Sequence, residues 1–309
     1  MPLTATQLPA LIKEIGRGTK GARDLPEADA EQLFGAMLQG SLPDLELGAI
    51  LLALRIKGES DDELIGFCRA MQSSTQSINV LDEEPVVVLP TYNGVRRQPN
   101  LLPLLALRLK DAGLRVLIHG RHDFDTRANP FPLFKAVGIH QAPSIEAAEA
   151  DLANTGIALL HTEQLNPGLN ELLSLRGRLG VRNTAHTLCK LLDPCPGRSV
   201  RVVNVTHPEY LIRMTALLSA QGGRAMLLRG TEGEAFANPR RRPELLGFRN
   251  GIGNVLFPTE EGGTPPIAGW PENADFDENV RLIQQLITAP ERIPQPILDQ
   301  ISALKSLSK

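Results

Sequence analysis

Aromatic residues are scarce in this sequence. Phe, Tyr and Trp together make up 4% of its 309 residues, with nine Phe, two Tyr and one Trp. A protein that binds single-stranded nucleic acid by stacking the bases usually needs a platform of such side chains. The composition therefore argues against base stacking as the main way in which this chain could recognise a ligand.

Cysteine is rarer still. Cys68, Cys189 and Cys195 form no CxxC pair, and an odd number of cysteines cannot be fully paired in disulfides. This pattern favours a reducing compartment. We therefore expect a cytoplasmic protein in which Cys189 and Cys195 are buried as small apolar residues.

Long apolar runs and targeting signals are absent as well. The first residues lack the basic segment and apolar core that are typical of a secretory signal. The longest apolar run, residues 47–54, is far shorter than the roughly 20 residues that cross a bilayer. We therefore expect no membrane partner.

The usual motifs of nucleophilic and metal catalysis are also missing. The sequence contains no Gly-x-Ser-x-Gly and no defensible Ser/His/Asp or Cys/His set. Two histidines and two aspartates within residues 119–127 could suggest a metal site, but no HxxxH or HExxH spacing places them on one helical face. We favour a polar loop at the edge of a sheet, in which Arg121 and Arg127 contact an anion.

The first seventy residues predict four short helices. Apolar residues at helical spacing indicate the first, and Pro26 begins the second in its first turn. Asp44 is predicted to cap the third. Ser60 and Glu63 form a capping box that opens the fourth. Because the links between them are short, we expect a small helical domain.

The pattern changes after Pro85. Residues 86–89 form a continuously apolar run, as expected for a strand buried on both faces. A helix at 101–111 and a strand at 115–118 complete a right-handed βαβ unit, which predicts an α/β fold with a mainly parallel central sheet. Further strands are predicted at 156–160, 200–205, 224–228 and 254–257, and further helices at 146–153, 169–179, 208–220 and 276–286.

Two arginines follow the first predicted strand, in the loop Pro90-Thr-Tyr-Asn-Gly-Val-Arg-Arg97. Parallel α/β folds bind ligands outside the carboxyl ends of their strands, so Arg96 and Arg97 could meet phosphate. Asn93-Gly94 permits positive φ, but a single glycine cannot form a multi-glycine phosphate cradle. The alternative is a surface turn with two solvated arginines.

Two carboxylates, Glu232 and Glu234, follow the strand predicted at 224–228. Carboxylate oxygens are suitable ligands for Mg²⁺. Two glutamates in a glycine-rich loop can equally belong to a structural turn, so this segment does not by itself predict a metal site.

Basic residues accumulate in residues 165–242, which contain twelve Arg and Lys against five Asp and Glu in a chain of net charge −3. Between Glu171 and Asp193 there is no acidic residue, so ion pairs four residues apart along a helix are missing. At helical spacing Arg178 and Arg182 would share a face, as would the cations that follow. We expect an anion-binding surface rather than a solvated face. The cations at the front of the segment are Arg176, Arg178, Arg182, His186 and Lys190, and those at its back are Arg240, Arg241 and Arg242.

Several segments together have the pattern of a known family. They are Leu42-Pro-Asp-Leu-Glu-Leu-Gly-Ala-Ile-Leu-Leu-Ala-Leu-Arg-Ile-Lys-Gly-Glu-Ser60, His119-Gly120, residues 175–183 and His207-Pro208. The chain resembles anthranilate phosphoribosyltransferases in these segments, and the resemblance covers nearly its whole length. It implies a small N-terminal helical domain, residues 1–72 with 165–192, beside a larger α/β domain, residues 73–164 and 193–309. It also implies a homodimer formed through the helical domains.

The catalytic signatures of those enzymes are altered here. Pro90-Thr-Tyr-Asn-Gly94 stands where the enzymes carry a Gly-Thr-Gly-Gly-Asp loop for pyrophosphate, and Asn100-Leu-Leu-Pro103 replaces Asn-Ile-Ser-Thr. Their Lys-His-Gly-Asn-Arg becomes Ile118-His-Gly-Arg-His122, and their Asp-Glu magnesium pair becomes Gly233-Glu234. Losing one positioned donor typically costs about 2.7–4 kcal/mol of transition-state stabilisation. The altered motifs therefore imply loss of efficient turnover.

Arginines replace many of those groups, and the segments Gly16-Arg-Gly18, Ala22-Arg-Asp-Leu25, Gly180-Val-Arg-Asn-Thr-Ala-His-Thr-Leu188 and Gly230-Thr-Glu-Gly-Glu234 are similar to the YbiB-type, nucleic-acid-binding branch of this family. That resemblance implies a homodimer that binds DNA or RNA with little sequence preference, without transferase activity and without a cofactor. The binding residues that we predict are Arg17, Lys20, Arg23, Arg96, Arg97, Arg121, Arg176, Arg178, Arg182, His186 and Lys190.

Two alternatives stay open. The chain could be a phosphoribosyltransferase with an altered acceptor, using Glu232 and Glu234 to bind Mg²⁺ and Arg176, which matches the arginine that meets anthranilate in the enzymes, to bind an acidic acceptor. It could also be a scaffold whose basic face has no ligand.

Overall fold

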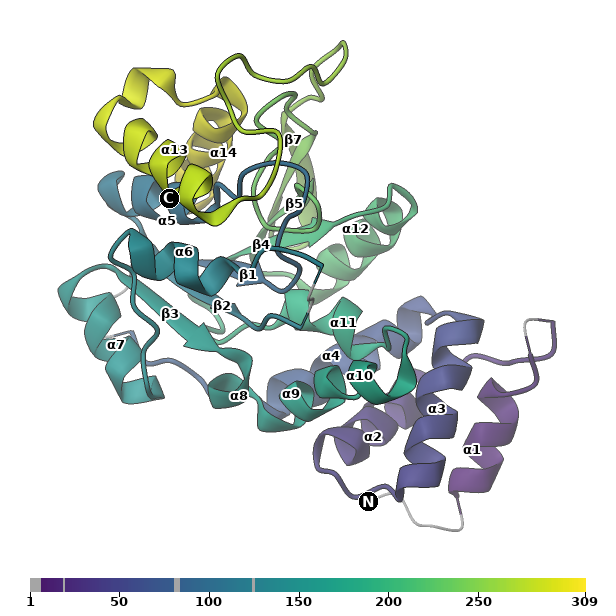
Figure 1. Cartoon of the computed structure of the whole chain (residues 1–309). Coiled ribbons are helices and arrows are strands. Elements are labelled where there is room, and N and C mark those ends of the chain that lie inside the picture. Colours follow the sequence, from purple (N-terminus) through teal and green to yellow (C-terminus); the bar gives the residue numbers. More distant parts are fainter. Residues whose placement is uncertain (1–6, 19, 81–83, 124–125) are drawn as a thin grey trace. The chain divides into compact units, whose positions relative to one another are not determined.

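The chain forms two compact units in the computed structural model, which describes residues 7–18, 20–80, 84–123 and 126–309 (Figure 1). The helical unit comprises Met1–Gln76 and Thr162–Pro194. The α/β unit comprises Ser77–His161 and Cys195–Lys309. Each unit is therefore assembled from two separate stretches of sequence.

The helical unit contains α1 to α4 and a second group of short helices. Helices α2 and α4 pack closely, because Gly66 lets the backbone of α2 approach and Phe34 lies against Phe67 with ring centroids 5.1 Å apart. The helices are α1 (Leu8–Ile15), α2 (Glu27–Leu38), α3 (Asp44–Lys57), α4 (Asp61–Ser74), α8 (Thr162–Leu165), α9 (Pro167–Ser174), α10 (Arg176–Leu179), α11 (Ala185–Leu188) and the 3₁₀ turn η1 (Cys189–Leu191).

The predicted helix starts are confirmed at α4 and corrected at α3. The Ser60 hydroxyl accepts a hydrogen bond from the Glu63 amide, and the Glu63 carboxylate accepts one from the Ser60 amide, which is the expected capping box. At α3 the cap is Pro43, and Asp44 is the first helical residue without a capping hydrogen bond. Asp44 instead places a negative charge in the first turn, where the helix dipole favours it.

The predicted helix over 169–179 is confirmed with one interruption at Leu175, whereas the helical face that Arg178 and Arg182 would share beyond it is wrong. Helix α9 ends at Ser174, and α10 ends where Gly180 adopts the left-handed conformation with φ of 72°. A glycine in this conformation is a common helix terminator. Arg178 and Arg182 therefore lie on opposite sides of a break, and His186 and Lys190 belong to further short helices.

The α/β unit is built on one seven-stranded sheet with the order β3-β2-β1-β4-β5-β6-β7. The first five strands in that order are parallel, and β6 and β7 join antiparallel at the edge. The expected mainly parallel sheet is thus confirmed. The strands are β1 (Val86–Thr91), β2 (Arg115–Gly120), β3 (Ile157–His161), β4 (Ser199–Val205), β5 (Arg224–Arg229), β6 (Leu245–Arg249) and β7 (Ile252–Phe257).

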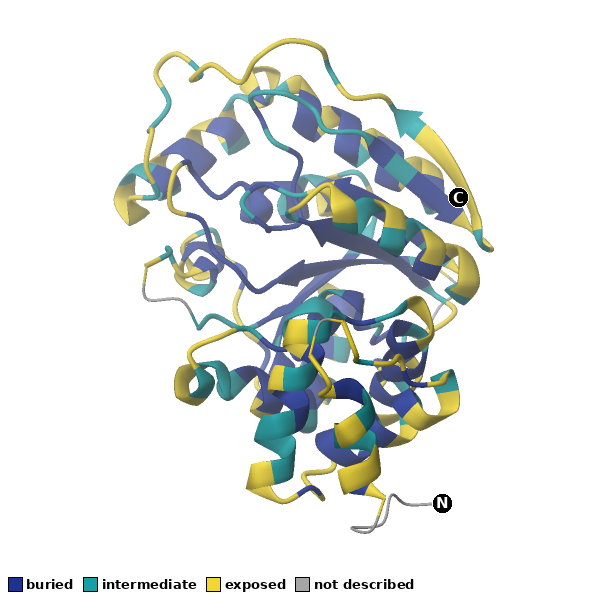
Figure 2. Ribbon diagram, turned by 90° about the vertical axis from the view of Figure 1, so that its right-hand side faces the viewer, coloured by how far each residue is buried: buried dark blue, intermediate teal, exposed yellow. Residues whose placement is uncertain are grey.

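Helices cover the sheet. The main core joins one face of the central strands to α5, α13 and α14, and these three helices lie together in Figure 1. Figure 2 shows the central strands as buried, and the edge strand β7 is largely exposed. The helices of this unit are α5 (Leu102–Asp111), α6 (Pro130–Ala136), α7 (Ile145–Asn154), α12 (Glu209–Gln221), α13 (Phe276–Thr288) and α14 (Gln295–Leu307), with the 3₁₀ turn η2 (Pro290–Arg292).

The sequence pattern does not predict three of these elements. Strand β6 is only five residues long and carries Gly247, which weakens a strand pattern. Helix α6 begins at Pro130 and contains a second proline, so its helical period is masked. Helix α14 buries Ile297 and Leu304 against the core, although its sequence follows a proline-rich turn. Among the described residues, no helix is both long and apolar enough to span a membrane.

Candidate functional site

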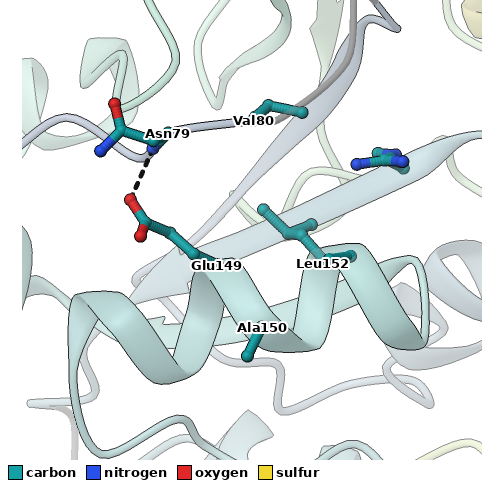
Figure 3. Close-up of a pocket in the computed structure, with 7 residues that line it drawn as sticks. Asn79, Val80, Glu149, Ala150 and Leu152 are labelled. Carbon is teal, nitrogen blue, oxygen red and sulfur yellow. Dashed lines mark hydrogen bonds between the residues drawn. The ribbon is translucent and has the colours of Figure 1, made fainter.

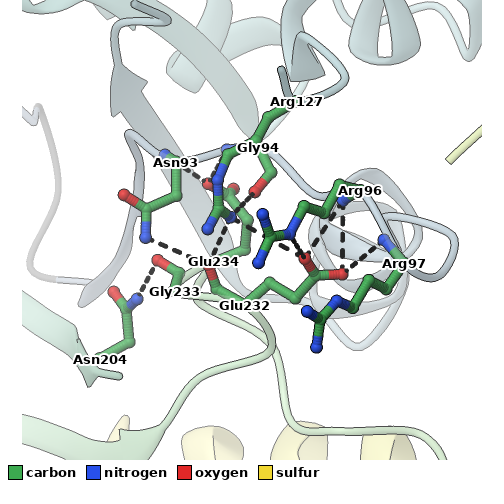
Figure 4. A network of polar contacts seen from close by, with 9 residues as sticks. All are labelled: Asn93, Gly94, Arg96, Arg97, Arg127, Asn204, Glu232, Gly233 and Glu234. Carbon is green, nitrogen blue, oxygen red and sulfur yellow. Dashed lines mark hydrogen bonds and ion pairs between the residues drawn. The ribbon is translucent and has the colours of Figure 1, made fainter. Parts of the chain in front are cut away.

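Two distant segments meet at the carboxyl edge of the parallel strands (Figure 4). The 93–97 loop, Asn93 to Arg97, follows β1, and the acidic turn, Thr231 to Glu234, follows β5. Strand β4 lies between β1 and β5 in the sheet. Because parallel strands end at the same edge, the loop and the turn come together there although some 140 residues separate them.

Glu234 is the buried half of this contact. Its side chain is fully inaccessible. One carboxylate oxygen accepts the hydroxyl of Thr91 at 2.5 Å, and the other accepts the backbone amides of Asn93 and Gly94 at 2.8 Å each. Three donors therefore satisfy this carboxylate without any solvent or ion.

Glu232 is the accessible half. Its carboxylate accepts the backbone amide of Arg97 at 2.9 Å and that of Arg96 at 3.2 Å. The Arg96 Nε and the Arg127 Nη1 each lie 3.9 Å from Glu232 Oε2. The side chain is 14% exposed, so part of it reaches solvent.

The backbone on both sides requires unusual conformations. Gly94 has φ of 66°, and Glu232 and Gly233 have φ of 51° and 91° at the two centres of the acidic turn. A Cβ atom on Gly94 would lie 2.3 Å from the Ala128 carbonyl oxygen, and one on Gly233 would lie 1.6 Å from Asn93 Nδ2. These glycines are therefore needed for the close approach as well as for positive φ.

Further hydrogen bonds fix the two segments. Arg127 Nη1 donates to the carbonyls of Gly94 and Glu232 at 2.9 and 3.0 Å. Asn93 Nδ2 donates to the Glu232 carbonyl at 3.2 Å, and Asn204 on β4 donates to the carbonyl of Gly233. Burial lowers the pKa of Arg127 from its usual value, and the nearby cations of Arg96 and Arg97 act in the same direction, while Glu232 and Glu234 oppose them.

Magnesium does not fit this arrangement. Mg²⁺ takes oxygen ligands at about 2.0–2.1 Å in octahedral geometry. The oxygens of Glu232 and Glu234 already face four backbone amides, and Glu232 also faces two guanidinium groups. Among the residues that the structure describes, no three His, Cys, Asp or Glu side chains cluster as a metal site.

The segment from the end of β2 into the following loop contains a buried histidine and an ion pair. His119 is fully buried on β2, with Nδ1 2.9 Å from the Tyr92 hydroxyl, and burial lowers its pKa to about 3. Arg121 Nε lies 2.5 Å from Asp123 Oδ2, with its side chain 15% exposed. The loop therefore uses Arg121 internally. Asp125, the second aspartate of the possible metal site, lies outside the described residues.

The predicted cations of the helical unit lie near its surface. Arg17 and Arg23 both approach Glu14, at 2.7 and 3.6 Å, and Lys20 between them is exposed. Arg178 is 74% exposed and lies 3.6 Å from Asp44. The remaining predicted residues of this unit are half-buried, namely Arg176, Arg182, His186 and Lys190.

Two of the three arginines at the back of the basic segment serve mainly the fold. Arg242 contacts Glu260 and Asp299 and lies over the ring of Phe257. Arg241 donates to the Gly262 carbonyl at 2.5 Å. The carboxylates of Glu260 and Asp299 compensate the charge of Arg242, whereas the carbonyl that Arg241 contacts leaves the charge of Arg241 in place.

A small cavity opens at the other end of β2 (Figure 3). It has a volume of about 140 Å³ and lies beside α7, where Glu149 accepts the Asn79 amide at 2.7 Å. Ligand pockets usually measure about 300–1,000 Å³. The cavity is therefore too small to be a substrate site.

The sequence does not predict the joint between the loop and the turn. In the sequence, Thr91 is notable only as part of the altered pyrophosphate motif, and nothing there indicates its contact with Glu234. Arg127 was expected to contact an external anion, but it contacts Glu232 and the carbonyl of Gly94. The sequence leaves the two carboxylates open as metal ligands or turn residues. No spacing within it indicates that they accept the amides of a loop that follows another strand.

Comparisons with known proteins agree on the fold. Residues 9–75 match the family of glycosyl transferase helical bundle domains. The crystal structure of anthranilate phosphoribosyltransferase from Thermus thermophilus superposes with a TM-score of 0.74 at 21% identity, covering 96% of this chain and 88% of that one. The Saccharomyces cerevisiae anthranilate phosphoribosyltransferase in complex with PRPP and Mg gives 0.75 at 14% identity, covering 99% and 89%.

Sequence relatives extend over most of the chain. The anthranilate phosphoribosyltransferase of Synechococcus sp. (strain JA-3-3Ab) is 28% identical over 271 residues, which are 86% of this chain and 78% of that protein. The protein YbiB of Escherichia coli (strain K12) is 40% identical over 295 residues, or 94% of this chain and 91% of that protein. The chain therefore belongs to the family of YbiB, within the proteins that share the anthranilate phosphoribosyltransferase fold.

Proposed function

We propose that the chain is a nucleic-acid-binding homodimer on a phosphoribosyltransferase fold, that it contacts the phosphate backbone of DNA or RNA, and that it has no transferase activity. The observation that carries the proposal is the weak pairing of the exposed cations in the helical unit. Arg17, Arg23 and Arg178 face only partly exposed or exposed carboxylates. Exposed ion pairs contribute about 0–1 kcal/mol, so a phosphate can replace the carboxylate at small cost.

The absence of transferase activity is proposed on separate grounds. Phosphoryl and pyrophosphoryl leaving groups need a metal ion and positioned donors. Here the carboxylates of Glu232 and Glu234 accept the amides of the 93–97 loop, so neither the donors nor the carboxylates are available. The three cysteines are buried, and an odd number of them cannot be fully paired in disulfides, which agrees with the cytoplasmic location that we propose with the function.

Salt dependence tests the binding. If about six phosphates of a single strand are contacted, the logarithm of the association constant should fall against the logarithm of salt concentration with a slope of roughly −4. Unrelated oligonucleotides should bind with similar affinity, because contacts to phosphate carry no sequence information. A gel-shift series at rising salt measures both. Undetectable or salt-insensitive binding would rule out the proposal.

A double substitution tests the residues. Arg178→Ala with Arg182→Ala should weaken the binding of all oligonucleotides alike and make the salt slope shallower by roughly 1–2. Arg69→Ala is the matched control for Arg178→Ala alone, because Arg69 is a 60% exposed arginine on α4 that pairs with Glu27. If Arg69→Ala weakens binding as much as Arg178→Ala does, net charge rather than this surface determines affinity.

A phosphoribosyltransferase with an altered acceptor is the second candidate. It is favoured by the relatives at 25–28% identity that are named anthranilate phosphoribosyltransferases. In this reading Arg176 would bind an acidic acceptor, and Glu232 and Glu234 would have to leave the loop amides to bind Mg²⁺. Magnesium-dependent consumption of phosphoribosyl pyrophosphate by the purified protein would establish this candidate over the first.

A further inference from the structure

We propose that Glu232 occupies an oxyanion site of its own chain, and that its carboxylate closes this site to phosphate and pyrophosphate. The site consists of the amides of Arg96 and Arg97 with the guanidinium groups of Arg96 and Arg127. This inference does not rest on nucleic-acid binding, because a loop that binds its own carboxylate can be tested with pyrophosphate alone.

The donors are those of an anion site. Successive backbone amides that point to one side, with a residue in the left-handed conformation among them, form a concavity for an anion. In the 93–97 loop Gly94 supplies the left-handed residue, and the amides of residues 93, 94, 96 and 97 all donate to carboxylates. The loop therefore binds negative charge already, and the charge comes from the acidic turn.

Glu234 and Glu232, the two carboxylates that bind the loop, differ in their exposure to solvent. Glu234 is fully buried and is held by three donors, so it belongs to the fold. Glu232 is partly exposed and faces accessible charge: Arg96 has a side chain that is 50% exposed, and Arg97 is exposed. Removing only the Glu232 carboxylate leaves two guanidinium groups and two released amides around a partly exposed position, with Glu234 as the remaining carboxylate.

The backbone conformation of Glu232 makes glycine the most suitable replacement for an experiment. Its φ of 51° is unfavourable for a side chain with a Cβ but natural for glycine. Glu232→Gly therefore removes the carboxylate and relieves backbone strain at once, so the variant should fold. Asn250 is the matched control, because it has φ of 48° in the turn between β6 and β7, away from the 93–97 loop in sequence and at the antiparallel end of the sheet.

Calorimetry tests the proposal. Inorganic pyrophosphate is titrated, without metal, into the wild type, Glu232→Gly and Asn250→Gly. We expect Glu232→Gly to bind roughly tenfold more tightly than the other two, or more, because charge-assisted hydrogen bonds to an anion become available. Adding Arg96→Ala to the Glu232→Gly variant should reverse the gain, because it removes a guanidinium group whose Nε lies 3.9 Å from Glu232 Oε2.

Two outcomes would overturn it. One is a folded Glu232→Gly that binds pyrophosphate no more tightly than the wild type, and Glu232→Gln, which keeps the length of the side chain without its charge, serves the same purpose if the glycine variant is unstable. The other is a gain in affinity that survives Arg96→Ala. Oligonucleotide binding, measured separately on the same variants, keeps failure of this inference distinct from failure of the proposed function.

Discussion

Two carboxylates that stand two residues apart, Glu232 and Glu234, have different surroundings. Glu234 is enclosed by Thr91 and the amides of the 93–97 loop, whereas Glu232 lies at the surface among arginines. The sequence identified both as chemically notable and left open whether they bind metal or form a turn. Their partners come from a loop after another strand, so only the folded chain could reveal that the two glutamates bind amides.

His119 gives a prediction at the residue scale. Burial lowers its pKa to about 3, while the unfolded chain has the usual value of about 6.5. Between these values the unfolded state binds one more proton than the native state, so stability rises with pH and is lost as pH falls from about 6.5 toward 3. The full effect amounts to roughly 5 kcal/mol.

Urea denaturation of wild type and His119→Gln between pH 7 and pH 4.5 measures this contribution. The difference in unfolding free energy between the two proteins should shrink as pH falls, because only the wild type has the buried imidazole. Carboxylates that titrate in both proteins cancel in the difference. A difference that is constant over this range would mean that His119 accepts a proton in the native state.

At the scale of elements, the local sequence pattern predicts the sheet and most helices, but it does not predict where neighbouring short helices are separated. The apolar runs of β1 and β4 and the capping box of α4 are predictable because their signals are local. The break at Gly180 is not, because a glycine inside a periodic stretch is compatible with either a helix or its end. This break also separates cations that were expected to share one face.

Glycine substitutions test the joint between the loop and the turn. Gly94→Ala and Gly233→Ala should each cost more stability than Gly113→Ala. All three have positive φ, but only the first two would place a Cβ against neighbouring atoms, whereas nothing lies within 4 Å of the position at Gly113. The conformational penalty alone is about 1 kcal/mol, and we expect at least about 2–3 kcal/mol at the joint. Chemical denaturation gives the values, and equal losses at all three would contradict a tight joint.

At the scale of the whole molecule, we propose that the homodimer forms through α3. Leu45, Leu52 and Ile56 are exposed by 81%, 40% and 61% and stand seven and four residues apart, so they line one side of the helix. An exposed apolar stripe of this kind is typical of an interaction surface. The family resemblance seen in the sequence implies a homodimer formed through the helical domains, and this expectation favours a second copy of the chain as its partner.

Leu52→Glu should convert the dimer into a monomer, because the new charge would be buried at the interface. Ile212→Glu is the matched control: Ile212 is 78% exposed on α12, so the substitution has the same chemistry on the α/β unit. Light scattering coupled to size-exclusion chromatography measures the mass. A wild-type monomer, or an unchanged mass for Leu52→Glu, would exclude α3 as the dimer interface.

The sequence by itself determined the class of fold, because strand and helix periodicity and capping are properties of neighbouring residues. It also determined that the basic residues are concentrated between 165 and 242. Only the tertiary structure decided which of those charges stay at the surface and which are used internally, as with Arg242 and Asp299. The physical reason is that a hydrogen bond or an ion pair depends on distances in space, and the sheet brings together loops that lie some 140 residues apart.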